Sequence, residues 1–199
     1  MNARVWFSDA VDAEAKANAA KTAAERQRHG RNAIDAMLAA ASLGHPDALV
    51  SLGNYYAHGA FGIIRARLDL AEHWLRLAAA RSAKGKCELG NLLWKTGRME
   101  EGHRWLRAAL AGGEGIAGWH LGLYFERRTP ARALRLYFRG AAFGSPIAAV
   151  FAGRLLESRG SRKALLQAES LYQQAAKVNF PKAEDDLGRV RRKLGHSPR

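Results

Sequence analysis

Cysteine, long apolar runs and acidic residues are all scarce in this chain of 199 residues. Cys87 is the single cysteine, which excludes an internal disulfide and agrees with a reducing compartment. No uninterrupted apolar run approaches the roughly 18 residues that a membrane span requires. Residues 1–20 also lack the apolar core of a secretory signal. We therefore expect a cytoplasmic protein without a membrane segment.

The shortage of acids leaves a strong positive charge. Lysine and arginine together number 32 against 18 aspartates and glutamates, a formal net charge of +14. Such a balance favours an acidic partner, which could be a nucleic acid, an anionic membrane or an acidic protein. The arginines are spread along the chain and do not form one basic arm. Hydrophobic residues make up 48% of the sequence, which is typical of a globular protein and excludes a disordered one.

Motifs for enzymatic chemistry are also missing. The sequence has no His-Glu-x-x-His, no cysteine pair with zinc spacing and no calcium loop. His73 and His103 each lie close to a tryptophan, and we interpret both as surface or packed imidazoles. Residues 113–118 satisfy G-x-G-x-x-G, but a predicted helix precedes them where a dinucleotide site needs a strand. We predict no catalytic residue, no metal ligand and no cofactor.

What the chain does contain is an internal repeat. A Leu-Gly or Ala-Gly pair closes five similar segments at spacings of 37, 32, 31 and 35, and these pairs are Leu52-Gly53, Leu89-Gly90, Leu121-Gly122, Ala152-Gly153 and Leu187-Gly188. Alanine four residues before the pair and apolar residues three and four after it form one helix face. A second apolar stripe, as in Ala71, Trp74 and Ala78, follows a short turn. A period in this range is typical of helical arrays, so we predict about eleven helices in hairpins and no strand.

The ends of the helices are predicted from glycine, asparagine and proline. Left-handed C-cap residues are expected at Gly44, Gly112, Gly113, Gly144 and Asn179. Pro46, Pro146 and Pro181 are expected in the first turn of the next helix. Residues 8–28 are predicted to form one alanine-rich helix that begins at Ser8 and shields the first repeat. Residues 188–199 are predicted to form a polar closing helix and a tail.

One copy carries the full phrase A-x-x-x-L-G-x-x-Y-x-x-G, at Ala48, Leu52, Gly53, Tyr56 and Gly59. Residues 33–195 thereby resemble the Sel1-like repeat, a relative of the tetratricopeptide repeat. The resemblance implies an all-α fold, a right-handed α-solenoid of about five helical hairpins with capping helices at both ends, in one domain over 1–199. Its expected parts are a capping helix and partial repeat (8–44), four repeats (45–82, 83–113, 114–145 and 146–180) and a closing helix with tail (181–199).

The resemblance also implies a concave groove lined by the first helix of each hairpin. Carried over residue by residue, the expected binding residues are Asn54, His58, Asn91, Trp94, Lys95, Trp119, Leu123, Arg127 and Arg154. The two asparagines recur in register and could bind a peptide backbone, or they merely solvate the surface. The tryptophans are candidate anchors, although Trp119 could instead pack against the preceding hairpin. The cations would form a positive rim for carboxylates.

The expected function is a non-catalytic protein-interaction scaffold or adaptor whose partner is a peptide or protein of acidic character. By resemblance, its role is that of a chaperone, a signalling adaptor or a toxin-immunity protein. The alternative is a basic accessory protein that binds nucleic acid, because arginines are dense between 127 and 139. No RNA-recognition, KH or helix-turn-helix phrase supports that alternative. An enzyme stays possible only if side chains from separate repeats converge on one cleft.

Overall fold

The computed structural model describes residues 2–195, and this range forms eleven α-helices. Residues 2–195 contain no β-strand, and Ala60 and Ile64 form an isolated β-bridge. The prediction of about eleven helices and no strand is therefore confirmed for the described residues. The helices are α1 (Ala3–Ala19), α2 (Ala23–Ser42), α3 (Pro46–His58), α4 (Leu68–Ala79), α5 (Ala83–Lys95), α6 (Met99–Ala111), α7 (Gly115–Glu126), α8 (Pro130–Ala142), α9 (Pro146–Glu157), α10 (Arg162–Ala176) and α11 (Ala183–Leu194).

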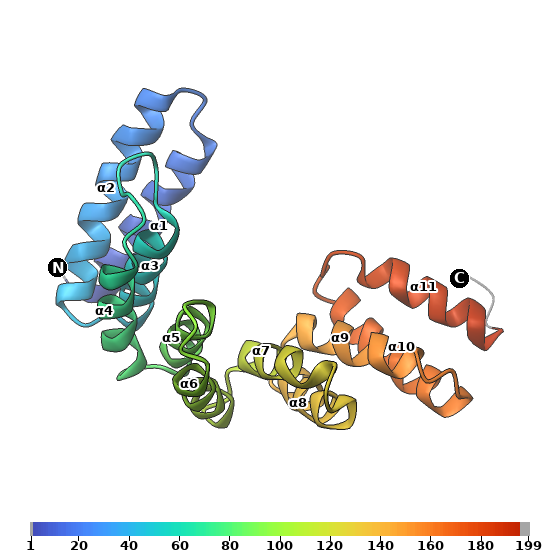
Figure 1. Ribbon diagram of the computed structural model, residues 1–199. Coiled ribbons are helices and arrows are strands. Elements are labelled where there is room, and N and C mark those ends of the chain that lie inside the picture. The colour runs from blue at the N-terminus through green and yellow to red at the C-terminus, as the bar shows by residue number, and fades with distance from the viewer. Residues whose placement is uncertain (1, 196–199) are drawn as a thin grey trace. The chain divides into compact units, whose positions relative to one another are not determined.

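The chain divides into two compact units, Met1–Trp105 and Leu106–Arg199, which we call unit 1 and unit 2. In each unit, helices that follow one another in sequence pack in pairs, such as α1 with α2, α3 with α4, α7 with α8 and α9 with α10 (Figure 1). Each unit buries its own apolar side chains. Met37 and Leu52 are fully buried in unit 1, and Tyr137 and Tyr172 are fully buried in unit 2.

Glycines of the repeated pair allow the two helices of a hairpin to approach closely. A Cβ atom at Gly122 of α7 would lie 2.1 Å from Cε1 of Tyr137 on α8. A Cβ at Gly153 of α9 would lie 2.7 Å from the same atom of Tyr172 on α10. Each glycine therefore provides the space that a buried tyrosine ring occupies, which gives the repeated Gly a packing role.

Most helix ends lie where the sequence predicts them. Positive φ angles of 79°, 90°, 82° and 53° occur within three residues after helix ends, at Gly44, Gly113, Gly144 and Asn179. The expectation for Gly112 is wrong, because its φ angle is not positive. Pro46 and Pro146 are the first residues of α3 and α9. The expectation for Pro181 is wrong, because α11 begins at Ala183 after Lys182, whose φ of 62° is incompatible with a right-handed helix.

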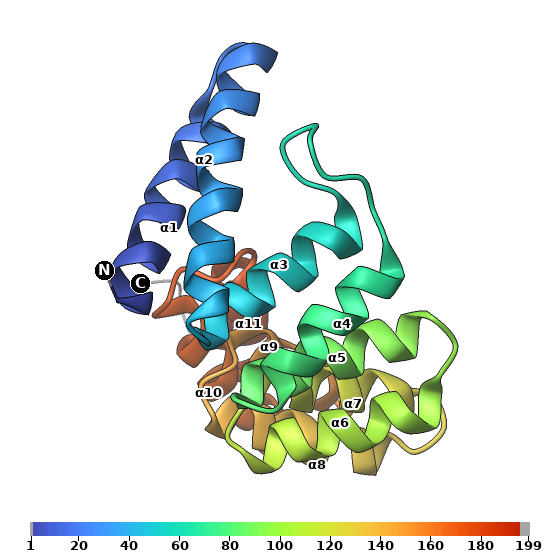
Figure 2. The ribbon, with the colours of Figure 1, turned by 90° about the vertical axis from the view of Figure 1, so that its left-hand side faces the viewer.

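The predicted single helix over 8–28 is also wrong. The chain forms two helices there, which lie side by side (Figures 1 and 2). The first begins at Ala3, where the side chain of Asn2 accepts a hydrogen bond from the backbone N–H of Val5 at 3.1 Å. The helix is interrupted before Thr22, which forms a capping box with Glu25. The side chain of each residue accepts a hydrogen bond from the backbone N–H of the other. This box starts a new helix despite the surrounding alanines.

A long connection joins α3 to α4 over residues 59–67, and Figure 2 shows it as an extended loop. It accounts for the longest spacing in the repeat, 37 residues between Gly53 and Gly90. None of the helices within residues 2–195 combines the length and apolarity needed to cross a bilayer.

Candidate protein-binding surfaces

In unit 1, the predicted site residues lie on two first helices that contact each other, α3 and α5. Asn54 and His58 are on α3, whereas Asn91, Trp94 and Lys95 are on α5. His58 and Lys95 are exposed and the other three are half-buried. The side-chain Oδ1 of Asn91 is buried and has no hydrogen-bond partner among the described residues. Unit 1 thus carries five of the predicted residues on neighbouring helices.

A cavity of about 480 Å³ lies at the C-terminal end of α3. Asn54 and His58 line it together with residues that the sequence did not indicate, namely Glu14, Asn18, Arg26, Tyr55, Gly59, Ala60 and Phe61. Burial, followed by the nearby carboxylate of Glu14, raises the pKa of Tyr55 far above its ordinary value. The phenol therefore stays protonated at neutral pH and can donate a hydrogen bond. The long spacing of 37 residues before Gly90 was the sequence signal for the additional loop residues that line this cavity.

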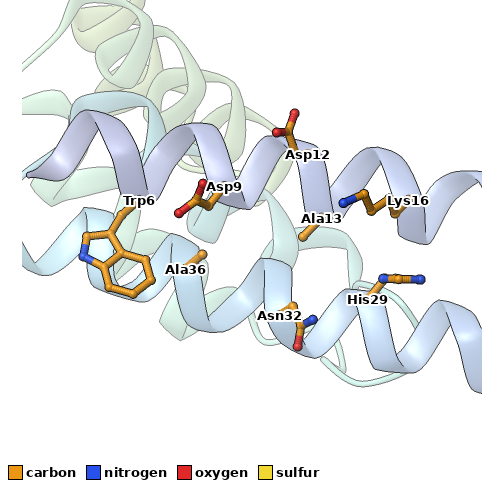
Figure 3. A pocket seen from close by; sticks show the side chains of 8 residues that line it. All are labelled: Trp6, Asp9, Asp12, Ala13, Lys16, His29, Asn32 and Ala36. Atoms are coloured by element: carbon orange, nitrogen blue, oxygen red, sulfur yellow. The ribbon is translucent and has the colours of Figure 1, made fainter. Parts of the chain in front are cut away.

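A second cavity in unit 1, about 420 Å³ in volume, lies between α1 and α2 (Figure 3). Asp9, Asp12 and Lys16 line it from α1, and His29 and Asn32 line it from α2. Asp12 points away from α2 in Figure 3. The described residues contain no cluster of three or more histidine, cysteine, aspartate or glutamate side chains suited to a metal ion. The cavity is a groove on the α1–α2 hairpin with both polar and apolar side chains in its lining.

In unit 2, Trp119, Leu123 and Arg127 belong to the α7 segment, with Arg127 as its C-cap. The ring of Trp119 packs edge to face on Phe151 of α9, with centroids 5.8 Å apart. Its indole Nε1 is buried without a hydrogen-bond partner in the described part of the chain. Trp119 therefore packs against the hairpin that follows it, and much of its ring contributes to the core. Leu123 is half-buried and Arg127 is exposed.

Arg154 of α9 is engaged in an ion pair. Its Nη2 lies 3.1 Å from Oδ2 of Asp186, whose side chain is 6% exposed. Arg189 joins Asp186 to Glu157 at 2.7 and 2.9 Å. Glu157 also accepts hydrogen bonds from Lys193 at 2.8 Å and from the hydroxyl of Tyr172 at 3.0 Å. We call Arg154, Glu157, Tyr172, Asp186, Arg189 and Lys193 the C-terminal network, and it ties α9 to α10 and α11.

The network determines the charge state of its buried glutamate. The hydrogen bond from Arg189 lowers the pKa of Glu157 to about 2, with further lowering by Lys193 and Tyr172 outweighing the effect of burial. Burial raises the pKa of Tyr172 above its ordinary value. At neutral pH, Glu157 is therefore an anion held by two cations, which favours a role in stability over a role in ligand binding.

The comparisons with known proteins agree with this architecture. A scan against protein-family models finds no match, and a search of curated proteins finds none either. Among solved structures, the chain is similar to a Sel1 repeat protein from Oxalobacter formigenes, with 26% identity over 84% of this chain and 71% of that one and a TM-score of 0.67.

It is also similar to a protective antigen of uropathogenic Escherichia coli strains that displays an SLR fold. The identity is 21%, the TM-score is 0.72, and the match covers 97% of this chain and 42% of the antigen. Both matches extend over most of the eleven helices of the described residues. The chain therefore has the fold of Sel1-like repeat proteins.

Proposed function

We propose that the protein is a non-catalytic scaffold that binds a protein or peptide partner of acidic character through the first helices of its hairpins. The observation that carries this proposal is the unpaired, buried Oδ1 of Asn91 on α5. A buried amide oxygen without a partner costs about 1–3 kcal/mol. Such a cost is reasonable at a position that serves binding, because an amide oxygen without an internal partner can accept a hydrogen bond from a backbone N–H of a bound peptide.

The neighbouring side chains fit the same role. Asn54 occupies the equivalent position on α3, so two amides recur along the surface. Trp94, one turn beyond Asn91, is half-buried and offers apolar area of the kind that dominates interface energies. Lys95 is exposed and forms no ion pair within residues 2–195, so it is available to a carboxylate. By binding such a partner, the protein would act as a chaperone, a signalling adaptor or a toxin-immunity protein.

Affinity capture from a lysate of the native cell tests this surface. Asn91→Ala and Trp94→Ala should each reduce recovery of the specific partner by about tenfold or more, because each removes a central contact. Leu77→Ala is the matched control, since Leu77 is 43% exposed on the second helix α4. Circular dichroism establishes that each variant is folded. Equal recovery with the wild type and both α5 variants would contradict the proposal.

Nucleic acid is the second candidate partner, favoured by the net charge of +14 and the arginines between 127 and 139. A salt titration separates the two candidates. Binding that rests on phosphate contacts loses affinity steeply between low and physiological salt because counterions are released. We expect at most weak binding of oligo-uridine that disappears at physiological salt. Tight binding that persists at physiological salt would favour a nucleic-acid-binding function.

A further inference from the structure

A third cavity, outside the predicted site, lies within unit 2 between α6, α7 and α8. Its volume is about 270 Å³, and it is lined by Arg107, Leu110, Leu121, Phe125, Arg132, Leu136 and Arg139. Leu110 and Leu121 are 2% and 1% exposed and form the floor. The three arginines are exposed and form the rim. We call this feature the arginine-rimmed pocket.

The lining of the arginine-rimmed pocket has a regular order along α8. Arg132, Leu136 and Arg139 are spaced four and then three residues apart, so they lie on one face of the helix. Seven helical residues place the two arginine positions about 10 Å apart along the axis. On α6, Arg107 and Leu110 are three residues apart, so a cation again lies beside an apolar residue on one helix face, as Leu136 and Arg139 do on α8. The pocket therefore has an apolar base with cations at intervals around it.

The rim arginines carry uncompensated charge. Arg107, Arg132 and Arg139 form no ion pair within the part of the chain that the structure describes. The acids of the same hairpin are engaged elsewhere. Glu126 accepts a hydrogen bond from the hydroxyl of Tyr137, and Glu114 caps α7 by accepting from the N–H of Ile116. The pocket is thus a positive surface around an apolar depression.

We propose that the arginine-rimmed pocket binds an acidic peptide segment of a partner protein, with one large aliphatic side chain in the depression and flanking carboxylates on the arginines. An extended chain advances about 3.3 Å per residue, so carboxylates three residues apart match the spacing of Arg132 and Arg139. Guanidinium groups bind carboxylates through two parallel hydrogen bonds. The leucines of the floor complement an aliphatic side chain.

Two features favour a peptide over other anions. Nucleic acids bind sequence-tolerantly by stacking bases on open aromatic faces. Here the guanidinium carbon of Arg132 lies 3.7 Å from the ring centroid of Phe125 and covers that face. The volume, about 270 Å³, is also below the roughly 300–1,000 Å³ of pockets that enclose small-molecule ligands. A single side chain of a larger partner fits this space.

The arginine-rimmed pocket shares no residue with the surface proposed on α3 and α5, and it extends the proposed function by giving a second contact and its chemistry. The two tests are independent. If the pocket does not bind the peptide, the capture results for Asn91→Ala and Trp94→Ala still stand. If Trp94→Ala does not reduce partner capture, the peptide can still bind to the pocket.

The test is fluorescence anisotropy with the full chain and a labelled peptide of sequence Ser-Glu-Gly-Leu-Glu-Ser. The wild type should bind it, and Arg132→Gln and Arg139→Gln should each weaken binding by about tenfold or more. Arg159→Gln is the matched control, because Arg159 is exposed in unit 2, forms no ion pair within residues 2–195 and lies outside the pocket lining. Arg132, Arg139 and Arg159 are all exposed, so their substitution leaves the core intact. A peptide with serine in place of leucine should bind about tenfold more weakly.

Several results would overturn the proposal. These are an absence of peptide binding by the wild type, equal binding of the serine peptide, or an equal loss of affinity in Arg159→Gln. A competing oligo-uridine that binds more tightly than the peptide and loses affinity in the same arginine variants would assign the pocket to nucleic acid instead.

Discussion

Gly122→Ala should lower the free energy of unfolding by about 2 kcal/mol or more. Alanine is intrinsically the better helix former, by roughly 1 kcal/mol. The added Cβ, however, would lie 2.1 Å from the ring of Tyr137, which is fully buried and whose hydroxyl is bound to Glu126. The ring therefore cannot move aside without disturbing both helices of the hairpin. Urea denaturation followed by circular dichroism measures the effect, with a midpoint lower by about 1 M.

Gly188→Ala is the matched control, because Gly188 closes the same repeated pair within α11. No heavy atom lies within 4 Å of the Cβ position at Gly188. This substitution should leave stability unchanged or raise it by up to about 1 kcal/mol through helix propensity. The same chemical change at two equivalent repeat positions is thus expected to lower stability at Gly122 and not at Gly188. Equal effects at both positions would contradict the packing role assigned to Gly122.

The second large effect is expected at the C-terminal network. Arg189→Met should destabilise the protein by about 2 kcal/mol at neutral pH. It leaves the buried carboxylates of Glu157 and Asp186 with one cation each, Lys193 and Arg154. Lys84→Met is the control, since it breaks an exposed pair with Asp47 and should cost less than about 1 kcal/mol. Urea midpoints of the two variants at pH 7 decide this comparison.

The same network predicts the response to acid. Glu157 has a pKa of about 2 in the folded protein against an ordinary value of 4.5. A depressed folded-state pKa means that its stabilisation is complete above the unfolded-state pKa and declines as pH falls from about 4.5 towards 2. The wild type should therefore lose stability across this window, whereas Arg189→Met should lose less and approach the wild-type curve. Parallel curves for the two proteins would show that Arg189 does not control this carboxylate.

The repeat could be predicted because its signals are local. Alanine, the Leu-Gly pair and the apolar residues that follow them lie within one helix, and their spacing determines the buried face. The N-terminal region was harder, because its alanine-rich composition favours helix throughout. The break depends on the single reciprocal pair of Thr22 and Glu25. At Pro181, the left-handed turn at Lys182 displaced the helix start by two residues.

The site was less predictable because it depends on contacts between repeats. Arg154 was expected on a positive rim, but it pairs with Asp186, which is 32 residues away. Glu157 and Arg189 are separated by the same interval, which is close to one repeat period. These pairs could have been predicted from charged residues of opposite sign that lie one repeat period apart on successive first helices. The arginine-rimmed pocket combines side chains of three helices, and no single stretch of sequence marks it.

The central claim is that this helical-repeat protein binds another protein, and photo-crosslinking in the native cell tests it most directly. A benzophenone amino acid in place of Trp94 places the reactive group on the proposed surface, and the same amino acid in place of Leu77 is the control. We predict a discrete crosslinked polypeptide from position 94 that is absent from position 77. Crosslinks to RNA, or the same pattern from both positions, would contradict it.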